Sequence, residues 1–284
     1  MTVSLTQQAT TNTTTATAVV ISNMVGAGVF GTTGFLARDL GDARLILLVW
    51  LLGCAYSLLG VACYRELVRR VPRSGGEYAF VNAGFGRFPG YLAGWSSFAV
   101  GFGASAAAIA HLFGSYTGEL FSALIPQATF SDNVIFRRLI ALALIWSLTF
   151  VHVGGIRYGG ATQRWLTWLK IGTILALIAG AFIAGNGDWG HMEERPAALP
   201  GIATFFISFM FVTFCYSGWN GATYITEEIR SRSRGVGTAL LLGTLTVGAL
   251  YLALNLVYVF ALSIPEMATA PIEPVAQKAA TALF

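Results

Sequence analysis

Two short glycine-rich segments lie inside long apolar stretches and could bind a ligand through backbone atoms. The first runs from Asn23 to Gly31 and reads NMVGAGVFG. Each of its three glycines costs about 1 kcal/mol relative to alanine in a helix. If the helix unwinds here, free N–H groups at the start of the following half-helix, assisted by the helix dipole, would bind a carboxylate.

The same segment permits other interpretations. It matches the dinucleotide fingerprint G-x-G-x-x-G, but that motif needs a preceding strand and an acidic residue about 20 positions later. The preceding residues are rich in threonine and the region around position 48 is apolar, so we exclude nucleotide binding. The glycines could instead form a small-residue face that lets a neighbouring helix approach closely. This segment alone does not separate close helix packing from unwinding.

The second segment lies far along the chain and has a similar character. It runs from Phe214 to Gly221 and reads FCYSGWNG. Paired interruptions at corresponding positions of two halves of a chain indicate the central site of a secondary transporter. Irregular backbone at membrane depth is tolerated only where protein or a water-filled cavity satisfies it. The pair of segments therefore favours unwinding at both places.

The stretches that must position these segments are long enough to cross a bilayer, which takes about 20 apolar residues. Of the 284 residues, 55% are hydrophobic and only 11% are charged. Soluble domains carry roughly 25% charged residues. The composition excludes a soluble globular domain, a disordered chain and a disulfide-rich scaffold. It predicts a polytopic membrane protein.

Seven membrane spans are predicted after a polar tail. None shows the alternating pattern of a barrel strand, so we expect an all-α protein. The tail covers residues 1–17, the membrane domain 18–262, and an extracellular loop 263–284. Residues 274–284 resemble the start of another helix that ends before it can pack, which predicts a truncated domain. The spans are 17–36, 45–64, 89–113, 137–154, 166–185, 202–226 and 236–262.

The net charge of +4 resides mainly in the loops between the spans. With a cytoplasmic N-terminus, the inner loops hold most of the lysines and arginines, among them Arg65, Arg69, Arg70 and Arg234. The positive-inside rule then favours this orientation. Because loop charge accounts for the basic balance, we expect no nucleic-acid partner.

The remaining reactive side chains form no recognisable site. The three cysteines lie in apolar stretches and are expected to be free thiols. The three histidines are scattered without the spacing of metal ligands. There is no convincing pair of nucleophile and base and no cofactor motif. We therefore expect no metal, no cofactor and no enzyme activity. The residues considered are Cys54, Cys63, Cys215, His111, His152 and His191.

Four motifs in order make the chain similar to a known family. They are Gly26–Phe30, Pro72–Tyr78 followed by Phe85-Gly86 and Gly94-Trp95, Tyr216–Asn220, and Glu227-Glu228. The chain resembles the amino acid–polyamine–organocation superfamily of permeases, in particular its L-type and bacterial amino acid permease branch. The resemblance implies a five-plus-five inverted-repeat (LeuT-like) core within twelve helices. This chain would supply the first repeat and two helices of the second, truncated after the seventh transmembrane helix.

By the same resemblance the protein is a secondary active transporter that moves amino acids across the plasma (inner) membrane by alternating access. The segments Met24–Phe30 and Phe214–Asn220 contain no Asp or Glu to pair a cationic side chain, which favours neutral amino acids. The alternatives are another small solute on the same fold, such as a polyamine, a nucleobase or an ion, and more distantly an intramembrane enzyme.

The resemblance also implies a substrate site at the two interruptions. The first would hold the substrate carboxylate, and carbonyl groups of Phe214, Cys215 and Ser217 would hold the ammonium. Phe214 would close over the ligand, although a phenylalanine in an apolar helix usually serves packing alone. The candidate substrate-binding residues are Met24, Gly26, Ala27, Gly28, Phe214, Cys215, Ser217, Trp219 and Asn220.

Lys170 is the candidate coupling residue. A lysine near a helix end often extends its ammonium to the membrane surface. Related permeases instead carry a lysine here that faces the first interruption, where it can replace a sodium ion or take part in proton coupling. We expect sodium-independent transport if the second interpretation holds.

Two features concern partners and gating. Eukaryotic L-type relatives join a heavy chain through a cysteine between helices three and four, but the stretch from Ser115 to Phe136 has no cysteine. We therefore expect no disulfide-linked heavy chain, and only the lipid bilayer and an amino acid as partners. Glu227 and Glu228 either pair with arginines of the inner loops as a gate or lie in water.

Overall fold

The computed structural model describes residues 11–125, 130, 133–153, 156–184, 186–194, 199–230, 232–269 and 275–284. Most of the predicted tail, residues 1–10, lies outside them. The described residues form helices and no strand; one isolated bridge joins Thr11 to Ile229. The all-α prediction is confirmed. The chain divides into two compact units, Met1–Gly76 with Leu166–Phe284, and Glu77–Trp165.

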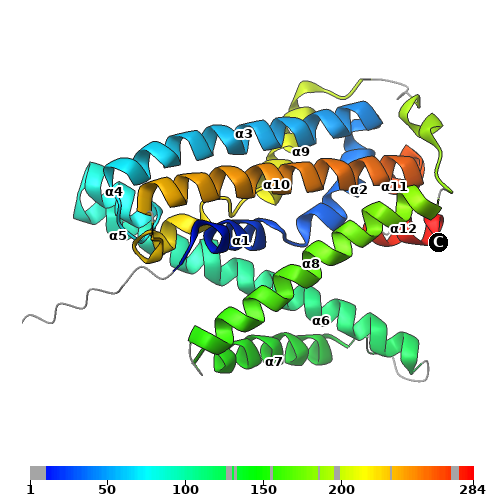
Figure 1. The fold of residues 1–284 in the computed structure, drawn as a ribbon. Helices are drawn as coiled ribbons and strands as arrows, with labels where there is room; N and C mark the ends of the chain where they lie inside the picture. The colour runs from blue at the N-terminus through cyan, green and yellow to red at the C-terminus, as the bar shows by residue number, and fades with distance from the viewer. Residues whose placement is uncertain are drawn as a thin grey trace, which may run out of the picture. The chain divides into compact units, whose positions relative to one another are not determined.

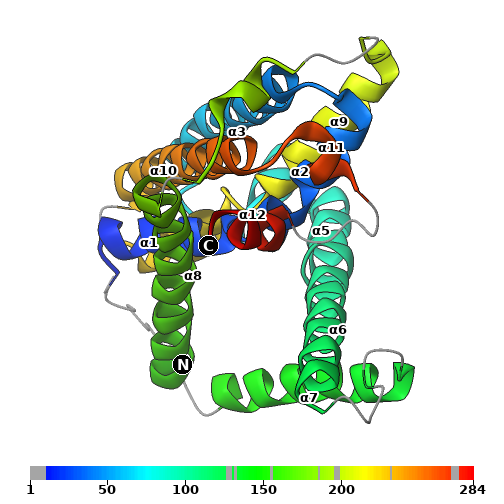
Figure 2. The same cartoon turned by 90° about the vertical axis from the view of Figure 1, so that its right-hand side faces the viewer.

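The first unit is organised around α3 (Ala43–Arg70) and α10 (Arg232–Ala261), which lie side by side (Figures 1 and 2). Their apolar faces supply much of the core, including Trp50, Leu240 and Leu254, all fully buried. Around them lie α1 (Thr13–Met24), α2 (Gly28–Leu40), α9 (Ile202–Cys215), the 3-10 helices η2 (Trp189–Met192) and η3 (Gly221–Glu228), α11 (Ile264–Ala268), α12 (Val275–Leu283) and the later part of α8 (Ile156–Ala184).

The helices agree with the predicted spans in order. Within the described residues, five helical stretches are long and apolar enough to cross a membrane, one of them the continuous stretch Arg87–Leu124, and Thr13–Met24 with Gly28–Leu40 counts as a sixth span bent by 43°. The sixth predicted span, 202–226, is not one helix, because α9 has only 14 residues and is followed by turns and η3.

The first helix begins earlier than predicted. Its N-cap is Asn12, whose side chain accepts a hydrogen bond from the Thr15 N–H. Asparagine is among the strongest N-caps, and it satisfies one of the donors that a helix start leaves free. The last threonines of the predicted polar tail therefore form the first turns of α1.

The C-terminal residues 274–284 were predicted to be the start of another helix that ends before it can pack. Residues 275–283 form α12, which packs against α10 and α2. Val275, Ala279 and Leu283 recur every four residues and are buried, so they form one apolar face. The predicted helix is present, and the structure differs only in its packing, because this face already has partners within the chain.

The second unit contains α4 (Glu77–Phe85), α5 (Arg87–Ser96), a π-helical segment (Ser97–Ala104), α6 (Ser105–Leu124) and α7 (Val134–Val153). Gly86, with φ +93°, separates α4 from α5. A Cβ on Gly90 would lie 2.7 Å from Asn82 Cβ, and one on Gly118 would lie 3.1 Å from Phe130 O. Small residues therefore let neighbouring segments of this unit approach closely.

Candidate functional site

The first interruption is present as a break between α1 and α2. Val25, Gly26 and Ala27 separate the two helices, and the Val25 N–H closes α1 by bonding Ile21 O at 2.9 Å. Ala27 is the N-cap of α2 and supplies no side-chain cap. A Cβ on Gly26 would meet no heavy atom nearer than Met24 O, at 4.0 Å. The start of α2 thus combines a positive dipole end with open space beside Gly26.

The second interruption follows α9. Residues 216–220 form turns, and Gly218 has φ +98°, a conformation that side chains other than glycine rarely adopt. The Ser217 N–H bonds Phe214 O at 3.0 Å, and the chain then continues as η3. Both predicted interruptions are therefore real breaks in the backbone.

The two breaks touch each other. A Cβ on Gly28 would lie 2.7 Å from Cys215 Sγ, and one on Gly218 would lie 2.7 Å from Asn23 O. Thr32 Oγ1 lies 3.1 Å from Cys215 Sγ, within hydrogen-bonding distance. Gly28 thus serves close packing, as the small-residue interpretation proposed, while the backbone nearby is also unwound. The two interpretations of the glycines are compatible.

Tyr251 of α10 links the breaks. Its hydroxyl donates to Met24 O at 2.7 Å, and Cys215 O lies 3.5 Å away. These carbonyls belong to the last residues of α1 and α9. The ring of Tyr251 is fully buried and makes edge contact with Trp50, with centroids 5.5 Å apart. One side chain therefore holds the C-terminal ends of both half-helices.

Sequence reasoning missed Tyr251, although a signal was available. Tyrosines of membrane helices gather at the two interfaces, and the hydroxyl of one placed well inside a span usually finds a hydrogen-bond partner. Asn255, one turn later, donates to Tyr251 O at 2.8 Å and accepts a hydrogen bond from Thr33 Oγ1. A buried polar stripe on α10 thus faces both α1 and α2.

Lys170 of α8 faces the first break. Its ammonium donates to Val25 O at 3.1 Å and to Ser22 O at 3.3 Å. These carbonyls lie at the C-terminal end of α1, where the helix dipole favours a positive charge. The geometry supports the interpretation in which the lysine faces the break over one in which it extends to the membrane surface.

Other candidate residues have different surroundings. Trp219 packs on α3, where a Cβ on Gly60 would lie 2.6 Å from its ring and Tyr64 makes an edge contact at 4.7 Å. Asn220 O accepts hydrogen bonds from the N–H and the hydroxyl of Thr223. The Phe214 side chain is 72% exposed. By contrast, Met24 and Cys215 are buried at the break itself.

The loop that carries the second motif docks on η3. Ser74 Oγ accepts from the Glu227 N–H at 3.0 Å, and the Ser74 N–H lies 3.4 Å from Glu227 Oε2. Gly76, with φ +54°, allows contact with the Tyr224 ring. Thr11 also pairs with this region, through bonds from its N–H to Glu228 O and from the Arg230 N–H to its own carbonyl, each 3.0 Å. Glu227 thus binds the motif loop through both its backbone N–H and its carboxylate.

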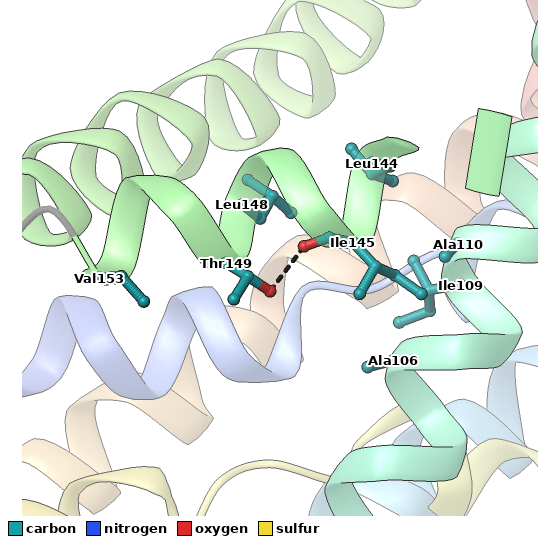
Figure 3. A pocket seen from close by; sticks show the side chains of 8 residues that line it. All are labelled: Ala106, Ile109, Ala110, Leu144, Ile145, Leu148, Thr149 and Val153. Atoms are coloured by element: carbon teal, nitrogen blue, oxygen red, sulfur yellow. Dashed lines mark hydrogen bonds between the residues drawn. The ribbon is translucent and has the colours of Figure 1, made fainter. Parts of the chain in front are cut away.

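A cavity of about 690 Å³ lies elsewhere, between α6 and α7. Figure 3 shows its lining, which is apolar apart from Thr149, and the Thr149 hydroxyl is bonded to Ile145 O at 2.7 Å. No lining side chain is charged, so nothing there would hold the two charges of an amino acid. Within the described residues no group of three His, Cys, Asp or Glu could hold a metal ion.

Comparison with known proteins decides the family. Residues 12–284 match the sequence profile of the amino acid permeases. The chain belongs to the amino acid permease family. The human Asc-type amino acid transporter 1 is 31% identical over 260 residues, which cover 89% of this chain and 48% of the relative.

Further relatives of this permease are also amino acid transporters. The rat large neutral amino acids transporter small subunit 2 is 28% identical over 257 residues, covering 89% of this chain and 47% of the relative. The mouse b(0,+)-type amino acid transporter 1 is 26% identical over 243 residues, covering 84% and 49%. The permease chain spans about half the length of these relatives. The family resemblance predicted from the four motifs is confirmed.

Proposed function

We propose that the whole protein is a secondary active transporter that moves neutral amino acids across the plasma (inner) membrane by alternating access. The main support for this proposal is that the breaks of two helices contact each other. One break presents the N-terminal end of α2, and the other presents the C-terminal end of α9. An amino acid carries a carboxylate and an ammonium on neighbouring atoms, so adjacent helix ends of opposite polarity complement it.

In this proposal the substrate carboxylate binds at Gly26, Ala27 and Gly28. The lack of a side-chain cap at Ala27 and the open space beside Gly26 support that placement. The substrate ammonium binds carbonyls of Phe214, Cys215 and Ser217, at the negative end of α9. Because the Phe214 ring is exposed, closing it over the ligand requires the ring to move.

Neutral substrates fit the charges near the breaks. The segments Met24–Phe30 and Phe214–Asn220 contain no acidic residue, and the Lys170 ammonium lies beside the first break. A cationic substrate side chain would find no counter-ion and would be repelled by Lys170. One of the relatives is named for large neutral amino acids, which agrees with this class.

Lys170 is the proposed coupling residue. Its ammonium already binds the carbonyl oxygens at the end of α1. A sodium ion bound to the same oxygens would therefore be repelled by the lysine charge at very short range. We therefore propose sodium-independent transport, either coupled to protons or by exchange, with a cytoplasmic N-terminus. The absence of cysteine between Ser115 and Phe136 supports a protein without a disulfide-linked heavy chain.

An uptake screen with the whole protein in proteoliposomes tests this function. We expect saturable uptake of radiolabelled leucine or alanine, competed by other neutral amino acids and unchanged when choline replaces sodium. Arginine should compete at least tenfold less well than leucine. Uptake of a polyamine or nucleobase in place of amino acids, or a preference for arginine, would reverse the substrate assignment.

A further inference from the structure

A second cavity of about 400 Å³ lies between the C-terminal end of α3 and the N-terminal end of α10. Arg65, Glu66 and Arg69 line it from α3, and Ser233, Arg234 and Thr238 line it from α10. Both helices belong to the first compact unit. The cavity lies apart from the two breaks and has no part in the proposed transport site.

The charges of this cavity are unbalanced. Glu66 is already paired, because Arg69 binds it through two nitrogens at 2.7 Å each and Arg70 binds it at 2.6 Å. Three arginines and one glutamate among the lining residues leave a net charge of +2. Within the described part of the chain, the guanidinium groups of Arg65 and Arg234 have no acidic partner. The site therefore attracts an anion.

The fold positions these arginines together. A Cβ on Gly237 would lie 3.2 Å from Arg65 Cγ and 3.3 Å from its Nε, so the glycine lets the Arg65 stem lie flat on α10. Arg234 lies in the first turn of α10, near the positive end of its dipole. The Ser233 and Thr238 hydroxyls add hydrogen-bond donors. Arginines that only set the orientation of the protein in the membrane would not need to come together from two helices.

The depth of the cavity in the membrane indicates the anion. α3 has 28 residues and α10 has 30, which gives lengths of about 42 and 45 Å at 1.5 Å per residue. The hydrocarbon core is only about 30 Å thick, so the charged ends of these helices reach the headgroup layer. Basic pockets between membrane helices at this level bind anionic lipid headgroups.

We propose that this cavity, formed by Arg65 and Arg234 with Ser233 and Thr238, binds the phosphate group of an anionic phospholipid. Arginine suits this role because its planar fork of N–H donors matches phosphate oxygens in pairs. The lipid tails would run along the apolar surfaces of α3 and α10, where Leu59 and Leu242 are exposed. The proposal is independent of transport activity.

Lipid binding to the purified full chain in mild detergent tests it. The probe is phosphatidylglycerol with a fluorescent acyl chain, and the competitors are unlabelled phosphatidylglycerol, phosphatidylcholine and inorganic phosphate. We expect competition by phosphatidylglycerol and at least tenfold weaker competition by phosphatidylcholine. An interfacial arginine contributes about fivefold in affinity, so Arg65→Gln with Arg234→Gln should weaken binding about 25-fold. The double lysine variant keeps the charge but loses the paired N–H donors, so its affinity should lie between those of the wild type and the double glutamine variant.

Two control variants separate the site from general basic charge. Arg73→Gln removes an exposed charge from the loop after α3 without touching the cavity, and Arg44→Gln removes one from the opposite end of α3. Each should change the affinity less than twofold. Because Arg65 and Arg234 are exposed, their variants should elute as the wild type does in size-exclusion chromatography.

Three results would overturn the proposal. The first is unchanged binding by a folded double glutamine variant. The second is an equal loss of binding in Arg73→Gln, which would indicate only unspecific surface charge. The third is displacement of the probe by inorganic phosphate as effectively as by phosphatidylglycerol, which would assign the cavity to a free anion.

Discussion

Tyr251 is the residue whose hydroxyl holds both half-helix ends, and its role can be isolated by removing one atom. Tyr251→Phe leaves the buried Met24 carbonyl without its 2.7 Å partner. Leaving a buried acceptor unsatisfied costs about 1–3 kcal/mol. We expect a loss of thermal stability of that order, together with reduced uptake because the ends of α1 and α9 lose a common anchor.

Tyr258, on the same helix, provides a matched control. It is also fully buried, and its hydroxyl has no hydrogen-bond partner among the described residues. Removing an unsatisfied buried hydroxyl is neutral or stabilising. Tyr258→Phe should therefore keep both stability and uptake. Equal effects of the two substitutions would show that the Tyr251 hydroxyl has no special role.

Lys170 is the second residue whose chemistry can be tested alone. Its ammonium binds Val25 O and Ser22 O, and the proposed function assigns this lysine the coupling role. Lys170→Ala should remove most of the pH dependence of uptake while the protein stays folded. Lys170→Met keeps the length of the side chain without the charge and should behave in the same way. Sodium-stimulated uptake by the wild type, or unchanged pH profiles in both variants, would assign the lysine a purely structural role.

Among the elements, the motif loop at residues 72–76 is fixed to η3 by few contacts. Ser74 accepts from the Glu227 N–H at 3.0 Å, and its own N–H lies 3.4 Å from the Glu227 carboxylate. Ser74→Ala removes the shorter bond, so the loop should open more often. We expect faster trypsin cleavage after the exposed Arg73, by several fold.

Ser74→Thr retains the hydroxyl and serves as the control, with cleavage at the wild-type rate. If Ser74→Ala is cleaved no faster than Ser74→Thr, the loop is held by other contacts, such as the packing of Gly76 on Tyr224.

The breaks and the helix order could be predicted from the sequence because glycine clusters and apolar length act locally. Gly26, Gly28 and Gly218 mark the interruptions without knowledge of any partner. The helix start at Thr13 was missed because a threonine run resembles a polar tail until Asn12 caps it. The packing of α12 was missed because it depends on faces of α2 and α10 that are distant in sequence.

The candidate site likewise contains features that local sequence predicts and features that depend on packing between distant segments. The position of Lys170 followed from family resemblance, and the contact of Gly28 with Cys215 required the packed helices. Tyr251 acts across more than 200 residues, so no local pattern identifies its partner. The family resemblance placed Trp219 among the candidate substrate-binding residues, and in the structure it lies against Tyr64 of α3 after the turn at Gly218.

For the whole molecule, the account depends on a substrate carboxylate bound at the first break. Gly28→Leu cannot test this alone, because its side chain would collide with Cys215 and disturb packing. Gly26 offers a cleaner test, since its side-chain direction meets no heavy atom closer than 4.0 Å. Gly31, three residues into α2, also has open space and supplies a matched control.

The most direct measurement is saturable uptake of radiolabelled alanine by the whole protein in proteoliposomes, comparing the wild type with Gly26→Leu and Gly31→Leu at equal amounts of folded protein. Gly26→Leu should abolish uptake, because the leucine side chain covers the N–H groups that receive the carboxylate, while Gly31→Leu should retain most of it. Normal uptake by Gly26→Leu would contradict the assignment of the carboxylate to this break.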